Sequence, residues 1–227
     1  MSPSSETPAE GPAPAPAAPA APDAAPTRVV VATGNPHKVA EIRAALAFPG
    51  WEFVAAGELG EWPEPAEDGE TFLANARIKA YAAHEAFGLP ALADDSGLEV
   101  DALDGEPGVH SRYYAGPCAT DAENNARLLF ALGDTPRTRR EARFRSVMVF
   151  VDADGTEVVA EGACEGAIGT EPRGEHGFGY DPLFWPEATP GRTMAELPMD
   201  EKNAISHRGA ALRALREALE ARASAAE

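Results

Sequence analysis

Two adjacent carboxylates, Asp94 and Asp95, stand in the stretch ADDSGLEVDAL (residues 93–103), directly after the apolar run GLPALA. This run is typical of a short buried strand, so we expect the acidic pair where the strand ends and a Ser-Gly turn begins. Ligands of open α/β sheets bind in the crevice beyond the carboxyl ends of strands. Because neighbouring carboxylates repel each other, a cation between them would favour their pairing. The alternative is a solvated turn, since Asp, Ser and Gly all favour turns.

A strand–turn–helix unit near residue 34 could bind an anion. The β-branched run RVVVATG (residues 28–34) is typical of a buried strand, and HKVAEIRAAL (residues 37–46) has the apolar spacing of a helix. The turn TGNPHK would present the unpaired amides of the helix N-terminus, and Lys38 adds a positive charge in the first turn. The turn lacks the pattern of a Walker loop, and an ordinary capped helix start is the alternative.

A glycine cluster followed by aromatic residues, GEHGFGYDPLFWP (residues 174–186), could let the backbone approach a flat ligand. Phe178 and Tyr180 would then offer an aromatic face beside it. The spacing of the glycines does not match the dinucleotide GxGxxG pattern. Taken alone, a β-turn packed on core aromatics explains the stretch better.

Three donors gather in MDEKNAISHRG (residues 199–209), close to a predicted helix start. Lys202 and Arg208 suit phosphate contacts, and His207 can hydrogen-bond the edge of a base. The alternative is a helix capped by Ser206 with solvated charges. The five histidines of the chain show no HExxH pattern, which argues against a zinc site.

The elements that must position these residues alternate between strands and helices, and a hairpin comes late. The periodicity predicts a strand over residues 51–56, helices over 71–88, 120–133 and 206–223, and a hairpin with the turn DADG over 143–168. An acidic loop, EWPEPAEDGE (residues 61–70), precedes the long helix, which Gly88 ends. The inward faces of the helices would carry Val39, Ile42, Leu46, Phe72, Ala76, Ala80, Ala83, Phe87, Leu212, Leu215 and Leu219. This order predicts an α/β fold with a mixed central β-sheet flanked by helices.

Composition limits the classes of partner. The formal charge of −18, from 37 acidic and 19 basic residues, argues against binding to polymeric nucleic acid but leaves a small phosphate ligand open. No apolar run approaches the roughly 20 residues that cross a bilayer, so no membrane partner is expected. Cys118 and Cys164 show no metal-type spacing and are expected as reduced thiols.

The domain organisation follows from a change in composition near residue 26. Residues 1–26 are rich in Pro and Ala and have neither a basic flank nor an apolar signal core, so we expect a disordered extension on a cytoplasmic protein. Residues 27–222 form one catalytic domain in this interpretation, and 223–227 form a short tail.

Five blocks of the sequence, in register, resemble the Ham1/RdgB-like inosine triphosphate pyrophosphatases, also called XTP/dITP diphosphatases. The blocks are ATGNPHKVAEI, EDGETFLANARIKA, ADDSGLEVDALDGEPGVHSRYYAG, GFGYDPLF and EKNAISHRGAAL, and the resemblance runs from about Val29 to about Leu219. One departure is Ala74, where the family commonly has Glu, so no carboxylate acts at that helix position here, though Asn75 and Lys79 of the same block remain.

The resemblance implies a two-lobed domain with a substrate cleft between the lobes, a homodimer and a Mg²⁺ requirement. It implies hydrolysis of ITP, dITP and XTP to the nucleoside monophosphate and pyrophosphate, which cleanses the nucleotide pool. By resemblance Asp95 is the catalytic proton acceptor and, because Mg²⁺ prefers carboxylate oxygens, a metal ligand together with Glu67. Glu64 and Glu70 are alternatives to Glu67. The expected substrate-binding residues are Thr33, Gly34, Asn35, Pro36, His37, Lys38, Ser96, Phe178, Gly179, Tyr180, Asp181, Lys202, His207 and Arg208.

Two other functions remain open at this point. A Maf-type nucleotide pyrophosphatase would share the architecture and the reaction but prefer other bases, and its signature motifs are not evident. A catalytically silent nucleotide sensor would bind the same ligand without turnover. The presence of Asp95, Lys38 and Lys202 favours an enzyme.

Overall fold

A six-stranded mixed sheet forms the centre of the protein, in a computed structural model that describes residues 26–225. The strand order is β2-β1-β3-β4-β5-β6. β1 pairs in parallel with β2 and β3, and the remaining pairs are antiparallel. The strands are β1 (Thr27–Val31), β2 (Trp51–Ala55), β3 (Ala91–Val100), β4 (Glu141–Val151), β5 (Glu157–Ile168) and β6 (Phe184–Pro186). The predicted mixed α/β fold is confirmed, including the hairpin of β4 and β5.

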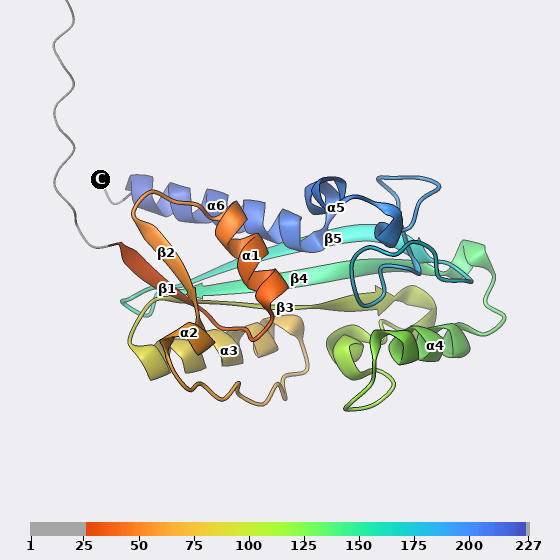
Figure 1. Cartoon of the computed structure of the whole chain (residues 1–227), viewed down its shortest axis with the longest axis horizontal. Coiled ribbons are helices and arrows are strands. Elements are labelled where there is room, and N and C mark those ends of the chain that lie inside the picture. Colours follow the sequence, from red (N-terminus) through yellow and green to blue (C-terminus); the bar gives the residue numbers. More distant parts are fainter. Residues whose placement is uncertain (1–25, 226–227) are drawn as a thin grey trace, which may run out of the picture.

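Helices cover both faces of this sheet (Figure 1). They are α1 (Pro36–Ala45), α2 (Ala56–Leu59), α3 (Phe72–Phe87), α4 (Asp121–Leu132), α5 (Met199–Ile205) and α6 (His207–Ala225), with short 3₁₀ turns η1 (Asp101–Leu103), η2 (Gly108–Tyr113), η3 (Arg137–Arg139) and η4 (Met194–Glu196). α1 and α6 lie on one face, α2 and α3 on the other, and α4 lies near the far end of the long strands. Among residues 26–225, no helix combines the length and the apolarity needed to span a membrane.

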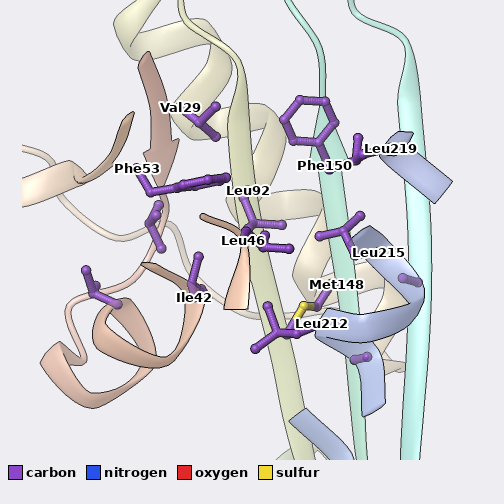
Figure 2. Close-up of a cluster of buried hydrophobic side chains, with 14 residues drawn as sticks. Val29, Ile42, Leu46, Phe53, Leu92, Met148, Phe150, Leu212, Leu215 and Leu219 are labelled. Atoms are coloured by element: carbon purple, nitrogen blue, oxygen red, sulfur yellow. The ribbon is translucent and has the colours of Figure 1, made fainter. Parts of the chain in front are cut away.

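Period-two alternation in the strands explains why both faces are apolar. In β1, Val29 and Val31 pack with the apolar faces of α1 and α6 (Figure 2), whereas Val30 packs against α3. The side of α3 that meets the sheet consists mainly of alanines, which let the helix approach closely. Leu128 and Leu132 of α4 belong to a third cluster, at the other end of the long strands. The sheet therefore joins two separately packed ends.

β3 continues through the acidic pair, so the predicted strand end and Ser-Gly turn are wrong. All of β3 is paired with β4, from Ala91↔Val151 to Val100↔Ala142. This antiparallel pairing keeps the backbone of β3 extended. β1, by contrast, pairs with β3 only at Ala91 and Leu92. The acidic pair therefore still lies beyond the carboxyl end of a parallel strand, but that strand is β1.

The chain ends differ in part from the predicted boundaries. The expected extension over residues 1–26 lies outside the described residues except for Pro26. α6 continues to Ala225, past the expected domain end at residue 222. Cys118 is exposed and Cys164 is buried, and both are free thiols.

Candidate functional site

A cleft of about 760 Å³ brings most of the predicted site residues together. Its walls come from the β1–α1 turn, the acidic loop, the middle of β3, η2, the segment around Phe178, and the α5–α6 junction. All the predicted site residues line it except Pro36 and His37, which are exposed on the first turn of α1. The cleft is bordered by residues from both ends of the sheet, as the two-lobed expectation requires.

Asp94 and Asp95 point to opposite faces of β3, because successive side chains of a strand alternate. Asp94 Oδ1 lies 2.9 Å from Lys38 Nζ of α1, and Asp94 Oδ2 lies 3.7 Å from Arg208 Nε of α6. Asp95 Oδ1 lies 3.1 Å from Lys79 Nζ of α3 on the other face. The nearest cations of the two carboxylates therefore lie on opposite faces of β3. The pleat separates them, and each has its own cations.

The two carboxylates also differ in ionisation. Burial would raise the pKa of Asp94, but the charges of Lys38 and Arg208 outweigh burial and hold its pKa well below the usual value. Burial raises the pKa of Asp95 to about 6, and the charge of Glu67 adds to the rise while Lys79 opposes it. Asp94 is therefore a fixed buried anion, whereas Asp95 faces the cleft and can exchange a proton near neutral pH.

α3 contributes two buried polar residues that the sequence analysis did not assign, Asn75 and Lys79. Lys79 Nζ contacts Glu67 Oε2 at 3.3 Å as well as Asp95. Asn75 Nδ2 donates to Asp95 Oδ2 at 3.3 Å, and Asn75 Oδ1 accepts from the amide of Gly69 at 2.8 Å. The signal was available, because the two residues are spaced i, i+4 on the face of α3 that was predicted to be buried.

Glu67 and Asp95 form a carboxylate pair that fits a divalent cation. Both carboxylates contact the same ammonium group, that of Lys79, at 3.3 Å and 3.1 Å, so they lie close enough together to share one cation. No group of three or more His, Cys, Asp or Glu side chains suited to a metal occurs in the described part of the chain. Two carboxylates leave the other positions to water and phosphate oxygens, which suits Mg²⁺. Glu70 does not line the cleft, whereas Glu64 lines it and accepts from the amide of Gly34 at 2.6 Å.

The TGNPHK turn combines a helix cap with an amide that already binds a carboxylate. Asn35 caps α1 by accepting from the amide of His37 at 2.9 Å. The predicted alternative of a capped helix start is therefore correct, and the same turn also lines the cleft. The amide of Gly34 donates to Glu64 Oε1 at 2.6 Å. A carboxylate oxygen thus occupies this donor, which demonstrates that the turn can bind an anionic oxygen.

The opposite wall combines an aromatic ring with charged donors. Phe178 is 43% exposed, and Lys202 Nζ lies 4.8 Å from the centre of its ring. Lys202 is ion-paired with the buried Asp181, whose Oδ2 also accepts from the amide of Phe178 at 2.9 Å. This wall therefore offers a flat apolar face next to a positive charge.

His207 and Arg208 begin α6 and complete this wall. Burial and the charge of Arg208 lower the pKa of His207 well below its usual value, so its ring is neutral at pH 7. Arg208 Nη1 is ion-paired with Glu41 Oε2 of α1 at 2.8 Å, and Nη2 lies 3.4 Å from Ser96 Oγ. The guanidinium is thus held from α1 and β3 at once. The site unites buried cations, a proton acceptor and an aromatic face in one cleft.

Known proteins share this sequence and fold over nearly the whole described chain. The model of the Ham1 family matches residues 29–218. A dITP/XTP pyrophosphatase of Methylococcus capsulatus is 53% identical over 196 residues, which cover 86% of this chain and 96% of that protein. One of Thermus thermophilus is 52% identical over 192 residues, covering 84% and 91%. The Staphylococcus aureus Ham1 protein superposes with a TM-score of 0.79 at 38% identity, covering 86% of this chain and 99% of that one. The chain belongs to the Ham1 family.

Proposed function

We propose that this protein hydrolyses the non-standard purine nucleoside triphosphates dITP, XTP and ITP to the nucleoside monophosphate and pyrophosphate. The observation that carries the proposal is that one cleft combines a pair of carboxylates with three cations. The carboxylates are Asp95 and Glu67, and the cations are Lys38, Lys202 and Arg208. Its relatives carry the name dITP/XTP pyrophosphatase. Hydrolysis of a phosphoanhydride requires positioning, charge neutralisation and a water that loses its proton.

The residues of the cleft divide the chemistry between them. Lys38, Lys202 and the amide of Gly34 bind the triphosphate and offset its negative charge. Asp95, with its pKa raised to about 6 by burial, takes the proton of the water that attacks the phosphorus bonded to the nucleoside oxygen. The pyrophosphate leaves with the anhydride electron pair.

Mg²⁺ is the cofactor in this proposal, held by Glu67 and Asp95. When bound, it would neutralise charge on the triphosphate oxygens and polarise the phosphorus that water attacks. Lys79 balances the same carboxylates and keeps them in place.

Recognition of the base falls to Phe178, His207 and Arg208. The ring of Phe178 provides a stacking face, and Arg208 can donate to the 6-keto group that inosine and xanthine bases carry and adenine lacks. An amino group facing the same donor would leave it unpaired, which costs roughly 1–3 kcal/mol and disfavours ATP.

The quaternary state and the location of the protein belong to the same proposal. We take the homodimer from the family resemblance and keep the cytoplasmic location expected from the composition of the chain. Light scattering of the purified chain tests the dimer. The charge of −18 supports a small-molecule substrate over polymeric nucleic acid.

The test is a panel of dITP, XTP, ITP, ATP, GTP and the pyrimidine triphosphates, with pyrophosphate and inorganic phosphate measured separately. We expect pyrophosphate from dITP, XTP and ITP, and little from the others. Asp95→Asn should lower kcat by about 10²–10⁴ while Asp134→Asn, an exposed residue outside the cleft, should not. Binding without release of pyrophosphate would identify a sensor, and a preference for other bases would favour a Maf-type enzyme.

A further inference from the structure

The wall around Phe178 and Gly179 has open space on both sides. Phe178, Gly179 and Asp121 line the substrate cleft, and the same three residues line a second cavity of about 500 Å³. The second cavity lies between α4 and the segment 172–179. A thin wall between two cavities stays in place only if specific contacts hold it.

Two side chains of α4 supply such contacts. Asp121 Oδ2 accepts a hydrogen bond from the amide of Gly179 at 2.6 Å, and Asn125 Nδ2 donates to the carbonyl oxygen of Gly179 at 2.9 Å. The two residues are spaced i, i+4 and therefore lie on one face of the helix. The amide belongs to the peptide plane shared with Phe178, and the carbonyl belongs to the plane shared with Tyr180. The pair thus fixes two successive peptide planes.

The residues on either side of Gly179 explain why this attachment matters. Gly177 and Gly179 have φ angles of 80° and 61°, so the wall turns on glycine backbone that is intrinsically free to move. Tyr180 is buried, and its hydroxyl donates to the carbonyl oxygen of Ser111 at 2.8 Å. Phe178, in contrast, is 43% exposed, so packing restrains its ring less than that of Tyr180.

We infer that Asp121 and Asn125 are positioning residues for selection of the base, and that they act by holding Gly179 so that the Phe178 ring faces the cleft. The inference rests on the proposed function, in which that ring stacks on the purine. Without the two contacts, the wall can shift toward the second cavity. A base stacked on the Phe178 ring then moves with it, and its 6-keto group is no longer held in line with Arg208. Removal of an interaction made equally in the ground state and the transition state raises KM and leaves kcat unchanged, so loss of base contacts should act on KM.

The kinetic test compares Asp121→Ala, Asn125→Ala and Asp121→Asn with the wild-type chain, using dITP and ATP. Ala122→Ser is the matched control, because Ala122 lines the second cavity on the same helix. We expect each alanine variant to raise KM for dITP and to lower the dITP preference over ATP by about tenfold, the effect of one lost hydrogen bond. We expect kcat for dITP to change less than about twofold. Asp121→Asn keeps an acceptor oxygen and should restore most of the wild-type KM.

Two kinetic outcomes would overturn the inference. A fall in melting temperature with unchanged KM and preference would assign the contacts to stability alone. Equal damage from Asp121→Asn and Asp121→Ala would show that the charge of Asp121 acts on the substrate directly.

Hydrogen exchange of the ligand-free protein provides a readout independent of turnover. The amides of residues 174–181 should exchange faster in both alanine variants than in the wild type and in Ala122→Ser. If wild-type protein releases no pyrophosphate from any nucleotide, the proposed function fails. Hydrogen exchange then still tests whether Asp121 and Asn125 hold the wall in place. Faster exchange in the alanine variants supports this role, and unchanged exchange contradicts it.

Discussion

At the scale of single residues, the adjacent acids of β3 have separate tasks because the strand places them on opposite faces. Asp94 is buried between Lys38 and Arg208 and does not line the cleft, whereas Asp95 does. Asp94 therefore keeps two substrate-facing cations in position, and Asp95 is the group available for chemistry.

Substitution of the two acids should separate stability from activity. Asp94→Asn leaves the buried Lys38 and Arg208 without their shared anion, which we expect to lower the free energy of unfolding by about 3–5 kcal/mol. Asp95→Asn should cost clearly less stability, because burial already disfavours the charge of Asp95, but it should cost far more kcat. Urea unfolding and steady-state kinetics in the same buffer measure both effects, and equal losses of stability would contradict the assignment.

The orientation of Arg208 depends on Glu41. Glu41→Gln replaces an ion pair of 2.8 Å, with both partners largely buried, by a weaker hydrogen bond, so the guanidinium should lose part of its fixed direction. We expect the ratio of kcat/KM for dITP over ATP to fall by about fivefold to tenfold, an effect of about 1–1.4 kcal/mol. Glu52→Gln, which removes an exposed pair with Arg28, is the control and should leave the ratio unchanged.

At the scale of elements, strand pairing outweighs the local turn preference of the sequence in β3. Asp-Asp-Ser-Gly favours a turn by local chemistry, yet the ladder with β4 keeps the segment extended. Gly97 does not form a turn; it is needed because η2 packs closely against β3 at this position. A Cβ added to it would lie 2.5 Å from both the carbonyl oxygen of Gly108 and the hydroxyl oxygen of Ser111.

Gly97→Ala should therefore be costly. We expect a loss of about 1–3 kcal/mol of unfolding free energy, because the added methyl group forces η2 away from β3. Gly57→Ala is the matched control: it lies in α2, has open space around its Cβ position, and should be neutral or slightly stabilising. Equal urea midpoints for both variants would show that η2 yields without cost.

The elements were predictable from the sequence to a greater extent than the contacts of the site. The apolar spacing of Val39 and Ile42, or of Leu212 and Leu215, identified α1 and α6 because burial of a helix face leaves a periodic record. The spacing of Asn75 and Lys79 places them on the buried face of α3 but does not identify Asp95 as their partner. Lys79 and Asn75 reach it from α3 through tertiary packing, and spacing along the chain does not encode which strand a helix will cover.

At the scale of the whole molecule, two separately packed ends border one cleft, and the proposed metal site does not hold them together. Hydrophobic clusters at both ends are complete without an ion, and Lys79 already neutralises part of the charge of Glu67 and Asp95. Folding and the chemistry of the proposed metal site therefore depend on different parts of the structure.

Removal of divalent cations tests this separation. Treatment with EDTA should abolish release of pyrophosphate from dITP, and addition of excess Mg²⁺ should restore it. The circular dichroism spectrum and the melting temperature should change little, since the hydrophobic clusters do not include Glu67 or Asp95. An EDTA sample presaturated with Mg²⁺ is the control, and unfolding on chelation would contradict the prediction.

The contact between Glu64 and the amide of Gly34 has a consequence for how the cleft discriminates among ligands. Because the carboxylate of Glu64 already accepts from this amide, an incoming anion must displace it. The free energy gained at the amide is then the difference between its hydrogen bond to the new anion and its hydrogen bond to Glu64. A neutral nucleoside gains nothing from that exchange, and a weakly basic oxygen gains little. Glu64 and the proposed metal ligand Glu67 belong to the same loop. The carboxylate that competes with an incoming anion for the Gly34 amide is therefore three residues from the proposed metal site.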